Sequence, residues 1–384
     1  MSDIEYENML FDHNVYDSWQ FIQYTQKVIA YSRFSKDVAS NLIVKIGDEH
    51  DEWQKRLFAT LNEQKRVSIK RDDFPTSQVY IAGISVDAYF LLEKLTKDFF
   101  QYCRNAFDGM GQIANSALLA NKRRKADSTD FPAMQKAFAK LTYSSVFPDM
   151  NTWFQTTAST PEFQYIDAFN NRTKHTFDVF LKVSMDMFGD FKTTEIHPFL
   201  RKEVQVDRRD MSSYLTGILD FVVNSFDEFL KVLEVECVKD AYNENRYNKL
   251  LVKQQKMNSD PKSDYSIVYL ENTEEFSTLP DEIFILLMKR YDDGTIDSKN
   301  CSIDRILICD KDNHYSARYI AETPVGDDTM LWYRKYVKDN TVTDTAVFLE
   351  ECKKTPIFYH QNPYMDIILV SDDEKFSNRC QFPF

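Results

Sequence analysis

Hydrophobic positions recur at three- and four-residue spacing over most of the first 242 residues, a pattern that is typical of amphipathic helices. The pattern predicts two or three helices over residues 14–65, a long helix from near Val79 that bends at Gly109 and Gly111, a short helix over 133–145, a helix from Pro161 to Gly189, and a long helix from Met211 to about Tyr242. Loops are expected over 122–132 and 146–160, and an irregular segment after Gly189. We expect the two long helices from Val79 and Met211, the short helix and the helix from Pro161 to pack as an antiparallel bundle.

After residue 264 the pattern changes to short runs of β-branched and aromatic residues separated by turn signals. These runs cover residues 265–270, 283–288, 305–309, 315–321, 331–337, 357–359 and 367–370, with one helix expected from Asp344 to Lys353. The polar stretch 243–264, which contains NSDPKSD, is the best candidate for a domain boundary. The sequence therefore predicts an α+β protein with N-terminal helices at 1–78, an all-α helical bundle at 79–250 and a smaller β-rich C-terminal module at 262–384.

Composition narrows the classes of function. The net charge of −13 disfavours a protein that coats nucleic acid nonspecifically, and the absence of a glycine-rich phosphate-binding motif sets aside dinucleotide-binding and P-loop folds. The acidic N-terminus has no signal-peptide core, and the longest apolar run, Ile283–Met288, is too short to span a bilayer, so we expect a cytoplasmic protein. The six cysteines form no CxxC pair and match no zinc pattern, so we expect reduced thiols, no metal and no cofactor.

The stretch Asn170–His175, with the sequence NNRTKH, places polar groups within the hydrophobic face of the helix predicted from Pro161. Arg172 lies inside the broad hydrophobic arc, and His175 lies one turn on at its margin and four residues after Asn171. A histidine can carry protons, an arginine can hold a phosphate through two parallel hydrogen bonds, and an asparagine can orient either group. The combination favours metal-free cleavage of RNA. The alternative is a solvated helix edge or a structural hydrogen bond.

Other charged residues have a structural interpretation first. Arg104 and Asp108, four apart, are predicted to form a structural ion pair, with support of the NNRTKH helix as the second possibility. His197 precedes a proline in an extended stretch and is predicted to be structural. Two basic runs are either solvated or contact RNA phosphates: residues 122–125, and Arg201, Lys202, Arg208 and Arg209.

The predicted bundle and the NNRTKH motif resemble the HEPN superfamily, whose ribonuclease members carry an arginine, a polar residue and, about three residues later, a histidine. The resemblance covers about residues 79–242. His175 matches the motif histidine and Asn171 the polar residue, whereas Asn170 occupies the arginine's place and Arg172 stands two positions later, a rotation of about 200° on a helix. The NxxxKH form looks like divergent HEPN-like proteins found beside bacterial conflict and phage-defence systems.

The resemblance implies a metal-independent endoribonuclease of a bacterial defence or toxin system, active as a homodimer that pairs two motifs in one cleft. It implies attack of the RNA 2′-hydroxyl on the adjacent phosphate, with His175 as proton carrier and Arg172, Lys174 or both stabilising the developing charge. Asn170 and Asn171 complete the candidate site. The implied partners are RNA, a second copy and an antitoxin or defence-system protein, without a membrane. The alternative is a noncatalytic HEPN-like scaffold or a module that binds a nucleotide or a protein.

Overall fold

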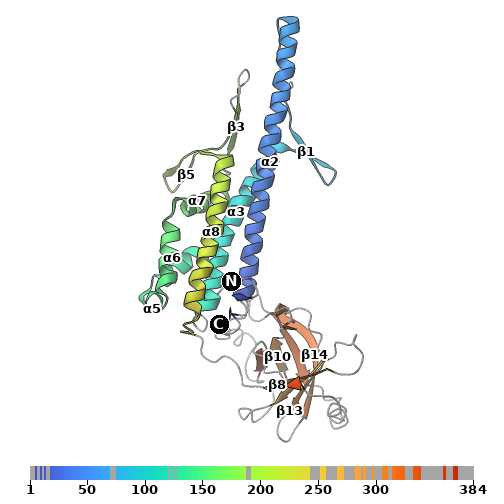
Figure 1. Ribbon diagram of the computed structural model, residues 1–384, viewed down its shortest axis with the longest axis vertical. Coiled ribbons are helices and arrows are strands. Elements are labelled where there is room, and N and C mark those ends of the chain that lie inside the picture. The colour runs from blue at the N-terminus through green and yellow to red at the C-terminus, as the bar shows by residue number, and fades with distance from the viewer. Residues whose placement is uncertain are drawn as a thin grey trace. The chain divides into compact units, whose positions relative to one another are not determined.

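The computed structural model (Figure 1) describes residues 18–69, 75–119, 128–186 and 192–242, isolated positions before residue 18 and between 119 and 128, and the backbone of the strands beyond residue 250. The chain divides into two compact units. We call residues 22–112 and 130–236 the helical unit, and residues 1–21, 113–129 and 237–384 the sheet unit. The α+β class is confirmed, because helices dominate before residue 242 and strands follow residue 250.

The helical unit is built mainly from long helices with short helices between them. They are α2 (Ser18–Gln64), α3 (Ala88–Ala114), α4 (Phe131–Phe138), α5 (Leu141–Ser144), α6 (Pro148–Ser159), α7 (Pro161–His175) and α8 (Met211–Cys237), and α3 continues as the π turn η2 (Asn115–Leu119). Helix α3 runs antiparallel to α2 and to α7, whereas α3 and α8 run parallel to each other, so the predicted antiparallel bundle is only partly correct. The side-chain contacts that fix these directions are Tyr31 with Tyr102, Thr25 with Gly109, Phe100 with Phe169, Phe107 with Phe163, Thr96 with Met211, and Phe107 with Phe221.

The core of the helical unit is aromatic. Its largest fully buried side chains are Phe99, Phe100, Phe107, Phe131, Phe138, Phe147, Phe154 and Phe169. Their rings meet at tilted, stacked or edge-on angles, such as Phe131 against Phe163 with 4.4 Å between ring centroids. Because these rings come from α3, α4, α6 and α7, one continuous core holds the short helices against the long ones.

The helical unit also contains short β-strands. The hairpin β1 (Gln78–Ile81) and β2 (Ile84–Asp87) turns at Ala82 and Gly83, which both have positive φ, a conformation that glycine adopts without strain. A three-stranded sheet has the order β3 (Leu181–Met185), β4 (Lys192–Ile196) and β7 (Arg209–Asp210). A second hairpin joins β5 (Phe199–Arg201) to β6 (Val204–Val206). Strands β3 to β7 follow the C-terminal end of α7 and lead into α8 (Figure 1).

The sheet unit contains an eight-stranded sheet with the order β16-β8-β9-β13-β14-β15-β10-β17. Strands β9 and β13 run parallel, and the other neighbouring pairs in this sheet run antiparallel. The strands are β8 (Leu251–Lys256), β9 (Ser266–Glu271), β10 (Glu282–Leu286), β13 (Arg305–Cys309), β14 (His314–Pro324), β15 (Trp332–Lys338), β16 (Phe358–Tyr359) and β17 (Asp366–Val370), with a separate pair β11 (Lys289–Arg290) and β12 (Ile296–Asp297). Each of the β-rich runs in the sequence therefore corresponds to a strand.

Several predicted elements of the helical part were wrong. The two or three helices expected over residues 14–65 are the single helix α2, because neither a proline nor a capped break interrupts it. The long helix expected from Val79 begins at Ala88, after a hairpin, because Gly83 allows a tight turn between two β-branched runs. The loop expected over 146–160 contains α6, which starts at Pro148.

The helix that carries the motif ends at His175 and not at Gly189. Residues 181–185 form strand β3, which pairs antiparallel with β4, where three of the five residues are β-branched. The irregular segment expected after Gly189 instead contains the strands from β4 to β7. The expected helix from Asp344 to Lys353 and the boundary stretch NSDPKSD lie outside the described residues, so the domain boundaries near 250 and 262 stay predictions.

Candidate functional site

Helix α7 is fixed at its start and along one face. The Thr160 hydroxyl caps the helix by accepting a hydrogen bond from the Phe163 amide at 3.3 Å, and Pro161 occupies the first turn. The predicted start of the helix at Pro161 is therefore confirmed. Phe169 stacks on Phe100 of α3 with 4.1 Å between ring centroids. This packing determines which residues of the following turn stay near the surface.

The five motif residues lie on α7 from its buried side to its exposed side. Asn170 is 4% exposed, Asn171 and Arg172 are half-buried, and Lys174 and His175 are exposed. The structure brings the three basic residues together in the last turn of the helix. Because the imidazole of His175 is exposed, one copy of the chain does not enclose it. The protected cleft expected between two copies stays a prediction.

One hydrogen-bond donor of the Arg172 side chain lacks an acceptor among the described residues. Its Nε is buried and has no hydrogen-bond acceptor within the described part of the chain. The guanidinium lies 5.9 Å from the centre of the Phe177 ring, a cation–π contact. Its backbone carbonyl closes the helix by accepting hydrogen bonds from the amide and the hydroxyl of Thr176, both at 3.1 Å. A buried N–H without an acceptor is costly, and because this Nε is closed to solvent, an anionic oxygen would meet the terminal nitrogens of the half-buried guanidinium.

A network of ion pairs precedes the motif on the same helix. The Arg104 guanidinium, on α3 and buried, pairs with Asp108, and its Nε donates to Oδ1 of Asp167 on α7 at 3.3 Å. Arg201 of β5 approaches the other oxygen of Asp167 at 3.6 Å. The amide of Asn171 donates to the Asp167 backbone carbonyl at 2.8 Å. The predicted Arg104–Asp108 pair is confirmed, and the network connects it to one motif residue.

Sequence reasoning missed Asp167 and the role of Arg201. The available signal for Asp167 was its position four residues before Asn171, on the same side of the helix. Arg201 stands in a basic run for which RNA contact stays a prediction, and three members of that run also contact protein side chains. Arg208 lies 4.0 Å from Glu195, and the Arg209 guanidinium lies 5.3 Å from the Tyr214 ring centroid.

Buried phenols and thiols in this part of the chain do not act as bases at neutral pH. Burial raises the pKa of Tyr165, and it raises that of Tyr214 to about 12 although Arg209 opposes the rise. Burial likewise raises the pKa of Cys103, and it raises that of Cys237 to about 12. Neither of these two cysteines forms a disulfide. Protonated at neutral pH, they are poor nucleophiles.

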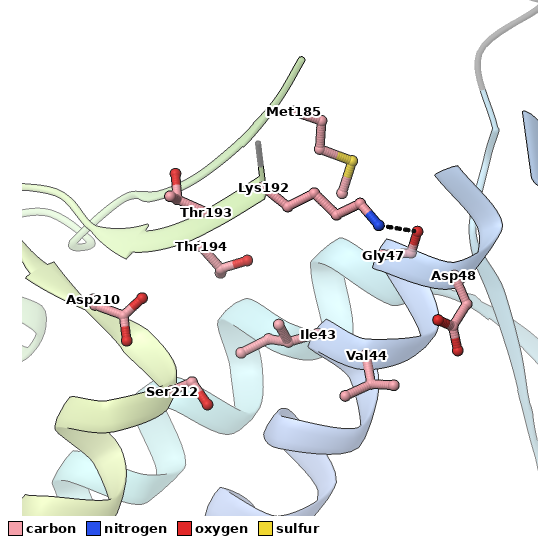
Figure 2. A pocket seen from close by; sticks show the side chains of 10 residues that line it. All are labelled: Ile43, Val44, Gly47, Asp48, Met185, Lys192, Thr193, Thr194, Asp210 and Ser212. Atoms are coloured by element: carbon pink, nitrogen blue, oxygen red, sulfur yellow. Dashed lines mark hydrogen bonds between the residues drawn. The ribbon is translucent and has the colours of Figure 1, made fainter. Parts of the chain in front are cut away.

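A pocket of about 320 Å³ lies elsewhere in the helical unit, between α2, the β3–β4 strands and the start of α8 (Figure 2). Two of its charged lining side chains, Lys192 and Asp210, make structural contacts. Figure 2 shows Lys192 of β4 reaching the Gly47 carbonyl of α2, at 3.5 Å, and Lys192 also pairs with Asp51. Asp210 caps α8 by accepting hydrogen bonds from the amide and the hydroxyl of Ser213, at 3.0 and 2.7 Å. Two of the charged side chains of the pocket, Lys192 and Asp210, are therefore engaged in structural contacts.

The described residues contain neither a cluster that could hold a metal ion nor a helix that could cross a membrane. No group of three or more His, Cys, Asp or Glu side chains there is placed to hold a metal ion. No helix in the described ranges is both long and apolar enough to cross a bilayer. Four of the six cysteines, Cys301, Cys309, Cys352 and Cys380, lie where side chains are not described.

Comparison with known proteins identifies one region of the chain. Residues 247–371 match a family described as a domain of unknown function (DUF8310). This range coincides with the strands from β8 to β17, so the match covers the β-rich region and not α7. No curated protein matches the chain, and no solved structure matches it.

Proposed function

We propose that the chain is a HEPN-like, metal-independent endoribonuclease that binds and cleaves RNA at the C-terminal turn of α7. One observation carries the proposal. The exposed His175 shares a helical turn with Arg172, whose buried Nε has no acceptor within the described residues. A phosphate oxygen is an acceptor of the right charge for this guanidinium, and the neighbouring imidazole is accessible to the atoms that surround that phosphate.

Each motif residue has a defined task in this proposal. His175 takes the proton of the 2′-hydroxyl as that oxygen attacks the adjacent phosphate; the bond from phosphorus to the 5′-oxygen breaks, the departing 5′-oxygen takes up a proton, and a 2′,3′-cyclic phosphate remains. Arg172 and Lys174 stabilise the charge that develops on the phosphate oxygens. Asn171 holds the turn in place through its bond to the Asp167 carbonyl. Asn170, which is buried, supports the helix from inside. The reaction needs no metal, because side chains supply both the proton transfer and the positive charge.

The wider setting belongs to the same proposal. The resemblance to HEPN proteins suggests a cytoplasmic toxin or phage-defence protein that works as a homodimer, so that two His175 side chains share one cleft. The β-rich region that matches the family of unknown function would then sense a signal, bind an antitoxin-like partner or direct the nuclease to its target.

A noncatalytic module is the second candidate, and one observation favours it. Asn171 is tied to Asp167, which in turn contacts Arg104 and Arg201, so part of the motif already has a structural role. In that case the three basic residues of the last turn complement the negative end of the helix dipole and bind an anionic partner without cleaving it.

Incubation of the purified chain with total RNA in EDTA separates the two candidates. We expect wild-type protein to cleave RNA and His175→Ala to lose about 10²- to 10⁴-fold in rate, as is usual for a general acid–base residue. His13→Ala is the matched control, since His13 bonds Asp240 in the sheet unit and has no part in the site. Intact RNA with the wild-type protein, or equal cleavage by His175→Ala, would favour the noncatalytic module.

A further inference from the structure

The segment that joins α7 to β3 exposes two aromatic rings close to the motif. Phe177 is 70% exposed and Phe180 is 67% exposed, although phenylalanine is normally buried. Exposure alone does not single them out, because Phe90 at the start of α3 is 63% exposed. Phe90, however, stands between Asp87 and Glu93 in the sequence, whereas the two rings after α7 have cationic neighbours.

The backbone of this segment is held in place. Val179, between the two rings, is 4% exposed and anchors the segment in the core. The Phe180 carbonyl accepts a hydrogen bond from the His197 amide at 2.9 Å, which extends the pairing of β3 with β4 by one position. The Phe180 ring is therefore presented on paired backbone, and Phe177 stands two residues before the buried Val179, so a ligand that stacks on the rings has a low ordering cost.

Positive charge surrounds the two rings. The Arg172 guanidinium lies 5.9 Å from the Phe177 ring centre, and Lys174 is exposed on the preceding helical turn. Lys182 is exposed two residues after Phe180, so in extended backbone it lies on the same face. The segment's one carboxylate, Asp178, pairs with Lys97 at 2.7 Å.

One further carboxylate lies near Lys182. Glu195 stands opposite Lys182 in the β3–β4 register. Arg208 approaches Glu195 at 4.0 Å, so this carboxylate has a cation on either side. The local excess of positive charge therefore remains.

We propose that Phe177 and Phe180, with Arg172, Lys174 and Lys182, form a binding strip for single-stranded RNA. Two base faces stack on the rings while the cations contact the phosphates between them, the combination by which proteins hold single strands. A duplex is a poor ligand, because its base faces are covered by their neighbours. This inference rests on the proposed function, for which it names the substrate class: unpaired RNA whose backbone passes His175.

Fluorescence anisotropy on the full chain tests the strip. All variants carry His175→Ala, so that cleavage does not consume the probe, a labelled single-stranded oligouridine. We expect Phe177→Ala and Phe180→Ala to weaken binding at least about fivefold for each ring removed, and replacement of both by tryptophan to retain it. Phe90→Ala, which removes an equally exposed ring, should leave binding unchanged. Circular dichroism of each variant confirms that the helices are intact.

The salt dependence of binding and the affinity for duplex RNA are two further measurements. With three cations in contact, the logarithm of the binding constant should fall with the logarithm of salt concentration with a slope of about −2. Lys174→Gln should reduce this slope, whereas Lys231→Gln, an exposed lysine of α8, should not. An RNA duplex of equal length should bind more weakly. Equal affinity for the duplex, or full affinity without the two rings, would overturn the inference.

The inference and the nuclease proposal fail in different ways. If oligouridine binds through the rings but wild-type protein leaves RNA intact, the binding strip stands and the nuclease proposal is wrong. If wild-type protein cleaves RNA and the variant without the two rings binds and cleaves equally well, the nuclease proposal stands and the strip is wrong.

Discussion

Helix α7 has a paired charged side chain within its first three turns, whereas basic side chains of its last turn are exposed to solvent. In the first turns, Asp167 is bound by Arg104 and Arg201, and Phe169 stacks in the core. In the last turn, the basic side chains Lys174 and His175 are exposed. The comparison shows that residue type does not decide whether a polar group is structural or available. Whether the group is structural or available depends on the side chains that the rest of the fold places beside it.

Removal of an aromatic ring should give the largest difference in unfolding free energy between the start of α7 and the segment after its last turn. Phe169→Ala opens a cavity against Phe100 and should lower the free energy of unfolding by about 3–5 kcal/mol. Phe177→Ala removes an exposed ring and should change it by less than about 0.5 kcal/mol. Urea unfolding followed by circular dichroism measures both. Similar losses in the two variants would mean that the end of α7 is as tightly packed as its start.

Removal of an arginine should give the next largest contrast. Arg104→Ala leaves the carboxylates of Asp108 and Asp167 without their shared cation, and Asp108 also accepts the Phe131 amide at 2.8 Å. Because these carboxylates are 32% and 28% exposed, water can solvate them in place of the arginine. We expect the free energy of unfolding to fall by about 2–3 kcal/mol.

Arg172→Ala is the matched variant, and it should cost less than about 1 kcal/mol, since its Nε has no acceptor in the described part of the chain. The same unfolding measurement applies to both arginines. A loss for Arg172→Ala as large as that for Arg104→Ala would assign Arg172 to the structural network and weaken the case for a ligand.

Two helical glycines extend the comparison to packed and open positions. A Cβ at Gly109 of α3 would meet the Thr25 hydroxyl of α2, so Gly109→Ala should cost about 1–3 kcal/mol. A Cβ at Gly217 of α8 would meet no atom within 4 Å, so Gly217→Ala should gain up to about 1 kcal/mol from the better helix propensity of alanine. Thermal melting of the two variants should therefore shift in opposite directions.

The sequence predicted the β-rich region better than the end of α7. Strand β13 has the predicted bounds, Arg305–Cys309, because a short β-branched run between turn residues has few other interpretations. Strand β8 was missed, since its sequence LVKQQK is largely polar. The residues after His175 contain phenylalanine, valine and leucine at spacings that suit a helix and a strand equally, so periodicity did not place the helix end.

The candidate site could be predicted only as far as it is local. Helical spacing correctly gave the start of α7, the shared turn of its basic residues and the Arg104–Asp108 pair. It did not give the contact between Arg201 and Asp167, because these residues are 34 positions apart in the sequence (201 minus 167) and meet only when β5 packs beside α7. Partners of this kind depend on tertiary structure, for which one-dimensional spacing carries no signal.

The smallest predicted effect concerns a buried histidine, in contrast to the exposed His175. His50 of α2 is 6% exposed, and burial lowers its pKa below the ordinary 6.5, an effect that Asp51 opposes and Lys192 reinforces. Between the lowered pKa and 6.5 the unfolded chain binds a proton that the folded chain does not. The His50 contribution to stability is therefore present above pH 6.5 and is lost as pH falls through the lowered pKa.

His50→Phe removes this titration while it keeps a ring beside Trp53, whose centroid lies 5.6 Å from the imidazole. We expect the unfolding free energy of the variant to fall less steeply than that of wild type between about pH 7.5 and pH 5. Urea unfolding at several pH values measures the two slopes, and the difference between them isolates His50 from the other titrating groups. Parallel curves would mean that the imidazole is as accessible to protons in the folded chain as in the unfolded one, and the contrast between a buried and an exposed histidine would lose its thermodynamic meaning.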